Sequence, residues 1–378
     1  MKTKKPVKRL ICLLIVLGLS LAATGSAAEK ERCEWPMFRG NRAQTGSYPG
    51  ELPDKLELLW THEAGEPVES TAAVVGDTAY VGTDGGQILA LDLEDGSRKW
   101  RFETEMSVRS SPGVMDGRLF AGDLGGYFYA LDAEDGSLAW KFETRGKIIS
   151  SANFVGDNVL VGSYDGYLYC LSRADGKLVW EAETQGPVHC SPCVAKDRAV
   201  VAGCDGWLRS FNLKTGKESG KVELGANVGA SPAFDGEFVY LMTFDGKMMC
   251  IDPFEETVKW KRETDEASVI YSASPAVRSG LAVFGGGDQV VRCLEAGSGD
   301  EKWRFKTGGE VDSSPVMVGD RVFVGSGDGN LYELDLRTGR KRWTFPAGAA
   351  LTASPALSQG RLVIGSGDGA IYCFGARN

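Results

Sequence analysis

The stretch ALDLEDGSRKW at residues 90–100 returns forty residues later as ALDAEDGSLAW at residues 130–140. The same forty-residue spacing continues along the chain, with one position taken by Gly220 instead of tryptophan and one interval of 43 residues. The tryptophans that mark the repeats are Trp60, Trp100, Trp140, Trp180, Trp260, Trp303 and Trp343. A fixed period of this length indicates a repeat architecture.

Each repeat contains four short apolar stretches separated by turn residues. In residues 313–345 these stretches are SSPVMV, RVFVGS, NLYELD and RKRWTF. Short β-branched and aromatic runs between Gly/Asp turns predict an antiparallel four-stranded sheet, and no segment has a helical period. Four strands in each unit of about 40 residues are typical of a β-propeller blade.

The ends of the repeat region indicate how the ring closes. The last repeat, residues 353–375, contains only three predicted strands. An isolated strand containing Trp60 lies at residues 56–62, before the first complete repeat. Joining it to the last repeat removes an open sheet edge. We therefore predict an all-β, eight-bladed propeller over residues 56–378, whose last blade is closed by an N-terminal strand.

Residues 1–28 have the features of a secretory signal peptide. Five basic residues precede the apolar run 10–23, and Ser26-Ala27-Ala28 is a small-residue cleavage site. No cysteine follows a lipobox, so we predict a periplasmic or secreted protein, with an uncleaved anchor as the alternative. Residues 29–55 are expected to wrap the propeller, and the segment 35–42 to lie along its rim or plug one end of its channel.

Charge and composition narrow the classes of partner. Removal of residues 1–28 leaves 37 Lys+Arg against 51 Asp+Glu, a net charge of −14. An acidic surface repels phosphate backbones and anionic lipid, so we expect neither nucleic acid nor a membrane surface as partner. Only two histidines, His62 and His189, are available for catalysis or metal binding. We expect a monomer.

The repeated residues resemble the PQQ-like, or quinoprotein-type, propeller repeat. Its pattern A-x-D-x-x-T-G-x-x-x-W is carried by segments such as ELDLRTGRKRW at residues 333–343, and the resemblance covers residues 56–378. It implies that each repeat tryptophan docks against a neighbouring blade. It also implies that the blade with Gly220 in the tryptophan position is looser at its rim.

The family that these repeats resemble contains two kinds of protein. Quinoprotein dehydrogenases bind PQQ and Ca²⁺, carry an adjacent Cys-Cys pair and have long insertions. The propeller subunit of the outer-membrane β-barrel assembly machinery is non-catalytic. This chain has no adjacent cysteines, and its repeats are of uniform length. We therefore expect a non-catalytic protein-binding or scaffold module in the cell envelope, without catalytic residues, metal or cofactor. A PQQ- and calcium-dependent dehydrogenase or another envelope oxidoreductase is the alternative.

The cysteines and the repeated aspartates have structural interpretations. Cys190 and Cys193 fall in one predicted strand, where positions i and i+3 face opposite sides, so a shared metal or disulfide is not expected. Cys204 is expected near His189, a minor candidate for metal or redox chemistry. Four further cysteines share one repeat position, which indicates packing: Cys170, Cys250, Cys293 and Cys373. Cys33 has no evident partner. The aspartates of the turns between the second and third strands are expected to shape those turns.

Positions that differ from repeat to repeat indicate where function lies. The residue before each Ser-Ser-Pro element opens the innermost strand and should face the central channel. Around the ring these residues are Glu69, Arg109, Ile149, His189, Gly229, Ser272, Asp312 and Thr352. We predict a partner-binding face made of Glu69, Arg109, Tyr164, His189, Phe244 and Asp312, with Tyr164 and Phe244 as exposed aromatic anchors. The alternative is that these loop residues vary because nothing constrains them.

Overall fold

The computed structural model describes Met1, residues 33–264 and residues 270–377. The predicted signal segment 1–28 lies outside this part of the chain, apart from Met1. Within the described residues, no helix has the length and apolar character needed to cross a membrane. Residues 33–378 cluster as one compact unit.

The described residues of this unit form eight separate sheets, each built on four antiparallel strands, and we number them as blades in chain order. Blade 1 is β3 (Ala73–Val75), β4 (Thr78–Thr83), β5 (Gln87–Asp92) and β6 (Arg98–Glu103). Blade 2 is β7 (Gly113–Met115), β8 (Arg118–Gly122), β9 (Tyr127–Asp132) and β10 (Leu138–Glu143). Blade 3 is β11 (Asn153–Val155), β12 (Asn158–Gly162), β13 (Tyr167–Ser172) and β14 (Leu178–Glu183). Blade 4 is β15 (Cys193–Ala195), β16 (Arg198–Ala202), β17 (Trp207–Asn212) and β18 (Glu218–Glu223).

Blade 5 is β19 (Ala233–Phe234), β20 (Val239–Met242), β21 (Lys247–Asp252) and β22 (Thr257–Glu263). Blade 6 is β23 (Ala276–Arg278), β24 (Leu281–Phe284), β25 (Val290–Glu295) and β26 (Glu301–Lys306). Blade 7 is β27 (Val316–Val318), β28 (Arg321–Gly325), β29 (Asn330–Asp335) and β30 (Lys341–Pro346), extended by β1 (Ser47–Tyr48). Blade 8 is β31 (Ala356–Ser358), β32 (Arg361–Gly365), β33 (Ala370–Gly375) and β2 (Glu57–Glu63).

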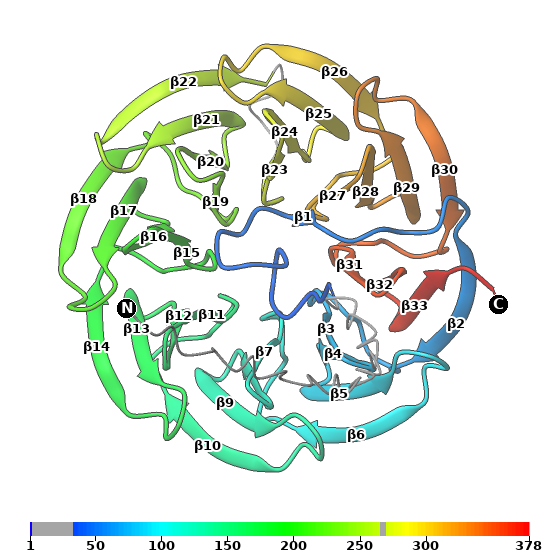
Figure 1. The fold of residues 1–378 in the computed structure, drawn as a ribbon, viewed down its shortest axis with the longest axis horizontal. Helices are drawn as coiled ribbons and strands as arrows, with labels where there is room; N and C mark the ends of the chain where they lie inside the picture. The colour runs from blue at the N-terminus through cyan, green and yellow to red at the C-terminus, as the bar shows by residue number, and fades with distance from the viewer. Residues whose placement is uncertain (2–32, 265–269, 378) are drawn as a thin grey trace. The chain divides into compact units, whose positions relative to one another are not determined.

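The N-terminal strand β2 closes the ring as its outermost strand in blade 8 (Figure 1). It runs antiparallel to β33, with Trp60 opposite Cys373. The predicted eight-bladed, four-stranded architecture and its closure are therefore confirmed. The first and last strands of the propeller thus lie in one sheet, and β33, the third strand of blade 8, is paired on both sides.

The innermost strands are shorter than predicted. In blade 7 the expected strand 313–318 reduces to β27, because Ser313 and Ser314 do not pair with β28 as a strand would. The backbone N–H of Ser314 instead donates to the hydroxyl of Ser354 in the next blade, at 3.0 Å. The residue that follows is a proline and has no N–H to donate. The Ser-Ser-Pro element is therefore a link between blades rather than the start of a strand.

Six repeat tryptophans lie beneath the outer turn of the following blade. In each, the indole N–H donates to a backbone carbonyl of that turn, as Trp303 does to Leu336 at 2.8 Å. A glycine of the same turn covers the ring, as Gly339 covers Trp303. A Cβ on this glycine would lie 2.6–2.7 Å from the ring in all six cases, which no real Cβ tolerates. The six are Trp60, Trp100, Trp140, Trp180, Trp260 and Trp303.

The junction between blades 4 and 5 lacks both the tryptophan and the glycine that covers it. Gly220 stands in the tryptophan position, and Glu256 stands in the glycine position of the next turn. Glu256 adopts a φ of 55°, and its carboxylate accepts from Lys221 N at 3.4 Å. Phe254 packs there beneath Lys196 and Arg198, whose cations lie 4.3 and 4.9 Å from its ring centre. A cation–aromatic cluster thus occupies the place of the indole.

Residues 33–48 cross the central channel and touch every blade (Figure 1). Backbone hydrogen bonds join this segment to the innermost strands of blades 1, 2, 4, 5, 6 and 7. Blade 3 reaches it through Asn153 Nδ2, which donates to Arg42 O at 2.8 Å. Blade 8 reaches it through Gln359 N, which donates to Tyr48 Oη at 3.0 Å. Of the two positions considered for the segment 35–42, the rim and the channel, the chain uses the channel.

Candidate functional site

A cavity of about 380 Å³ opens at the end of the channel that faces away from this crossing segment. All eight variable residues identified before the Ser-Ser-Pro elements line it. We call these residues the channel mouth: Glu69, Arg109, Ile149, His189, Gly229, Ser272, Asp312 and Thr352. The sequence pattern thus brought together side chains from eight blades that lie up to 283 positions apart.

A closed ring of hydroxyl residues forms the next layer down the channel. Each residue's backbone N–H donates to the hydroxyl oxygen of the next blade at 2.8–3.3 Å, and Ser354 donates back to Thr71. The ring consists of Thr71, Ser111, Ser151, Ser191, Ser231, Ser274, Ser314 and Ser354. Each ring residue follows a mouth residue by two positions. The ring therefore fixes the backbone that carries the variable side chains.

The crossing segment supplies the floor of the cavity. Phe38 lines it from below, and the neighbouring Arg39 is completely buried. Arg39 Nη2 donates to the carbonyls of Pro275 (3.0 Å) and Pro315 (2.6 Å), directly after two residues of the hydroxyl ring. Burial lowers the pKa of Arg39 to about 9. The crossing segment thus closes the channel beneath the cavity.

One sector of the mouth is charged. Arg109 donates to both carboxylate oxygens of Asp84, at 3.1 and 2.8 Å, and its Nη1 lies 3.3 Å from Glu69. Ser272 Oγ donates to Asp312 at 2.6 Å. Burial raises the pKa of Glu69, and the nearby carboxylates of Asp84 and Asp312 add to the rise against the opposing effect of Arg109. The sector therefore holds three carboxyl groups, two of which contact the guanidinium of Arg109, and it is net negative.

The opposite sector is aromatic. Tyr164 Oη and His189 Nδ1 share a hydrogen bond of 2.5 Å, and Lys147 Nζ lies 4.3 Å from the centre of the Tyr164 ring. Burial, with Lys147 as the second cause, lowers the pKa of His189 and favours its neutral form. The ring of Phe244 lies over Gly229, where an added Cβ would come within 2.4 Å of it. These contacts fix the orientation of both aromatic rings.

The expectation that Tyr164 and Phe244 are exposed anchors is wrong in degree. Both are only partly exposed, because Tyr164 is held by His189 and Phe244 folds over a residue without a side chain. Neither lines the cavity itself, but each contacts a residue of the channel mouth, Tyr164 through His189 and Phe244 over Gly229. Cys204 lies close enough to Tyr164 to raise its pKa, after the larger effect of burial.

The cysteines of the described residues are all unpaired. Cys190 precedes β15 instead of lying in a strand, and it takes the position of the first serine of the Ser-Ser-Pro element. Its Sγ donates to Ala202 O at 2.8 Å, whereas Cys193 Sγ donates to Ala43 O at 3.3 Å. The two thiols therefore have separate backbone partners. In the described part of the chain, no cluster of three or more His, Cys, Asp or Glu has the geometry of a metal site.

The turn aspartates hold the loops beside the mouth. Asp165 accepts from Tyr167 N at 3.1 Å within its own turn and from Arg145 N at 2.9 Å in the loop that leads into the same blade. Asp328 accepts from Asn330 N and Gly308 N in the same way. These residues shape the turns and tie each to a second loop.

Two family models match the sequence. One describes the beta-propeller of the beta-alanine-activating enzyme and covers residues 53–279, more than half of the chain. The other describes outer membrane protein assembly factor BamB and covers residues 204–378. The chain belongs to the PQQ-like β-propeller family. Among curated protein sequences, no significant match was found.

Solved structures with the same fold include both kinds of PQQ-like propeller. BamB from Moraxella catarrhalis shares 19% identity, with a TM-score of 0.75 over 85% of this chain and 100% of its own. A europium-containing methanol dehydrogenase shares 16%, with a TM-score of 0.76 over 91% and 98%. Quinohemoprotein alcohol dehydrogenase from Comamonas testosteroni shares 14%, with a TM-score of 0.77 over 91% and 81%. At these identities the similarity establishes the fold alone.

The mouth of this PQQ-like propeller does not suit PQQ and Ca²⁺. PQQ is a planar tricarboxylate, and the charged sector already holds Glu69, Asp84 and Asp312 against one arginine. A further three carboxylates would be repelled. Calcium needs six to eight oxygen ligands around one point, but Arg109 occupies both oxygens of Asp84.

The predicted set of face residues left out three contributors to the site. Phe38 reaches the cavity from the N-terminal segment, Lys147 covers Tyr164, and Asp84 pairs with Arg109. Asp84 occupies the same variable turn position as Tyr164 and Phe244, so its place in the repeat was a usable signal. The repeat contains no equivalent of Phe38.

Proposed function

We propose that this PQQ-like propeller is an exported, non-catalytic scaffold that binds a protein partner in the cell envelope through its channel mouth. The observation that carries the proposal is the contrast between two adjacent layers. The hydroxyl ring is nearly identical in all eight blades, while the mouth two positions away differs in every blade. The supporting layer therefore repeats from blade to blade, whereas the residues that it holds at the channel mouth differ in every blade.

The chemistry of the mouth suits a protein surface. Aromatic side chains held in one orientation lose little entropy when a partner covers them, and arginine and tyrosine are enriched at binding hot spots. Tyr164 and Phe244 stand at one sector, and Arg109 with its carboxylates stands at the other. A partner with an apolar side chain beside a basic one would match both sectors. The basic-then-apolar segment at residues 1–28 supports export.

Substituting Tyr164, Phe244 and Arg109 together by alanine is expected to reduce partner capture at least tenfold. Arg109 belongs to the channel mouth and the two aromatic side chains contact mouth residues. Hot-spot losses of this kind are about 1–2 kcal/mol or more each. The measurement is quantitative affinity capture with tagged wild type and variant from envelope extracts. The matched control replaces Leu138, Val258 and Arg101, exposed on outer strands, by alanine.

Two results would contradict the proposal. One is equal capture by wild type and the triple mouth variant when the circular dichroism spectra of both are unchanged. The other is a stoichiometric quinone spectrum, with dye reduction by alcohols or sugars, after PQQ and Ca²⁺ are added to the purified protein. That result would favour the dehydrogenase alternative.

A further inference from the structure

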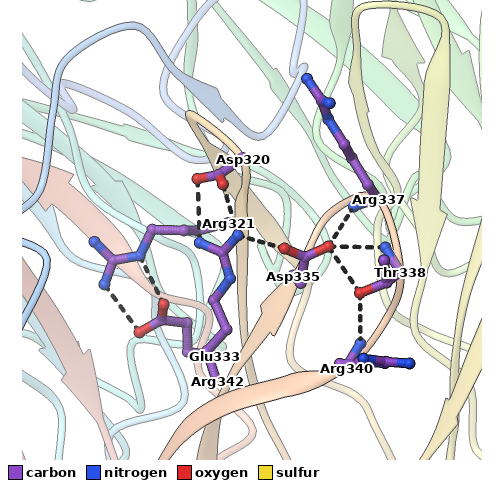
Figure 2. Close-up of polar contacts among 8 residues, drawn as sticks. All are labelled: Asp320, Arg321, Glu333, Asp335, Arg337, Thr338, Arg340 and Arg342. Atoms are coloured by element: carbon purple, nitrogen blue, oxygen red, sulfur yellow. Dashed lines mark hydrogen bonds and ion pairs between the residues drawn. The ribbon is translucent and has the colours of Figure 1, made fainter.

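The buried guanidinium of Arg39 has no carboxylate beside it. Among the described residues, Arg209, Arg292 and Arg321 are also buried, and each of them forms an ion pair with a carboxylate. Figure 2 shows Arg321, which donates to both oxygens of Glu333 at 2.8 and 2.9 Å. Arg39 forms no ion pair with any described residue, and its Nε and Nη1 have no hydrogen-bond acceptor among them.

Arg39 keeps its charge close beneath the hydroxyl ring. Burial alone lowers its pKa, to about 9, so the side chain is still protonated at neutral pH. Its Nη2 donates to the carbonyls of Pro275 and Pro315, which directly follow Ser274 and Ser314 of the ring. An unbalanced charge in a low-dielectric interior attracts an opposite charge strongly. The inner end of the cavity therefore favours an anionic group.

The hydroxyl ring offers eight hydrogen-bond donors at the same depth. Each ring oxygen accepts a backbone N–H from the neighbouring blade. In the part of the chain that the structure describes, none of the eight O–H groups has an acceptor of its own. The ring residues are only 3–5% exposed, and all of them line the cavity. Because a hydroxyl rotates to suit its acceptor, the ring can present these donors to a ligand.

The polarity is reversed at the channel mouth. Asp312 accepts from Ser272 Oγ and forms no ion pair with any described residue. Glu69 and Asp84 share the guanidinium of Arg109. A ligand that enters the cavity therefore meets carboxylates first, then hydroxyl donors, and finally the field of a buried cation. This order suits a ligand with a cation at its outer end and an anion at its inner end.

A lysine at the C-terminus of a protein combines both charges in one residue. Its main-chain carboxylate can lead into the cavity, while its ammonium stays at the level of the mouth. Phe38 and Ile149 line the cavity and can contact the methylene groups between the two charges. The cavity volume of about 380 Å³ falls in the range of pockets that hold small ligands. A tricarboxylate such as PQQ brings no cation to the mouth.

We propose that the cavity binds the C-terminal lysine of the partner protein, with its carboxylate at the hydroxyl ring and its ammonium between Glu69 and Asp312. This inference rests on the proposed function, because it names the part of the partner that enters the channel mouth. Capture of a C-terminal carboxylate is a known mode of peptide recognition. Here the basic side chain adds a second, opposite charge that must fit at the same time.

The test is isothermal titration calorimetry of the full-length protein with the peptide acetyl-Gly-Ala-Ala-Lys, which ends in a free carboxylate. Two altered peptides remove one charge each: a C-terminal amide removes the anion, and norleucine in place of lysine removes the cation. We expect each to bind at least tenfold more weakly, because each loses a charged hydrogen-bonding group. Free lysine should also bind at least tenfold more weakly, since its additional α-ammonium would face Arg39.

One pair of variants tests the position of the ammonium. Asp312→Asn keeps an acceptor for Ser272 Oγ and loses the charge, so it should weaken the lysine peptide at least tenfold. The same variant should change the affinity of the norleucine peptide by less than about twofold, because that peptide has no ammonium to lose. The matched control, Asp157→Asn, removes a charge from the exposed turn between β11 and β12 and should leave both affinities unchanged.

Four results would overturn the inference. These are no binding of the lysine peptide at millimolar concentration, equal binding of the amide, equal binding of free lysine, and an equal effect of Asp312→Asn on the lysine and norleucine peptides. Failure here is distinct from failure of the proposed function. If the triple mouth variant loses its partner while the lysine peptide does not bind, the inference is wrong and the proposed function stands.

Discussion

Replacing Arg292 by leucine is expected to lower the free energy of unfolding by about 3–5 kcal/mol. Arg292 in β25 donates to both oxygens of Asp288, and both side chains are less than 5% exposed. The substitution leaves a buried carboxylate without its cation, and water cannot replace the lost partner. Urea denaturation followed by tryptophan fluorescence measures the effect, provided that the slope of the transition is unchanged.

The chain itself supplies the matched control for this prediction. Blade 1 has Gly85 and Leu89 at the positions of Asp288 and Arg292, so it closes the same turn without an ion pair at these two positions. The double variant Asp288→Gly/Arg292→Leu should therefore be more stable than the single variant. A single variant that is as stable as the double one, or more so, would show that Asp288 is not buried as described.

Truncating Trp303 to alanine is expected to cost about 3–5 kcal/mol, the range for a large buried aromatic. The side chain is 7% exposed, donates to Leu336 O and lies beneath Gly339. Its loss removes packing between blades 6 and 7 and leaves the Leu336 carbonyl without its donor. The same denaturation experiment measures the change.

Trp343→Ala is the comparison for Trp303→Ala. Trp343 packs against Phe374, with ring centres 5.6 Å apart, but it is less buried and makes no hydrogen bond within the described residues. We therefore expect a smaller loss than for Trp303. Equal losses would contradict the larger contribution that we assign to the deeper burial and the hydrogen bond of Trp303.

The repeat made most of the fold predictable. Glycine, aspartate and tryptophan recur at fixed offsets, and each has a local physical role that sequence alone reveals. The isolated strand with Trp60 allowed the blades to be counted. The last repeat has only three predicted strands, and this strand supplies the fourth. The length of the inner strands was not predictable in the same way. Ser314 bonds to another blade, and only the closed ring brings that blade within reach.

The candidate site could be predicted from the sequence for those residues that occupy equivalent positions in the repeats. Glu69 and Asp312 lie 243 positions apart, yet equivalent places in their repeats put them in one cavity. Phe38 and Arg39 could not be placed, because the crossing segment has a unique sequence and its path depends on hydrogen bonds to all eight blades. The partial burial of Phe244 depends on the missing side chain of Gly229 in a neighbouring loop, a pairing that periodicity does not encode.

Site-specific photo-crosslinking in the native envelope tests the central proposal most directly. A photoreactive phenylalanine is placed at Phe244, beside the channel mouth, and in a second strain at Val258, which is 42% exposed on the outer strand β22 of the same blade. We expect one dominant covalent partner adduct from position 244 and none from position 258. An adduct from position 258 alone, or no adduct from position 244, would contradict a binding function for the channel mouth.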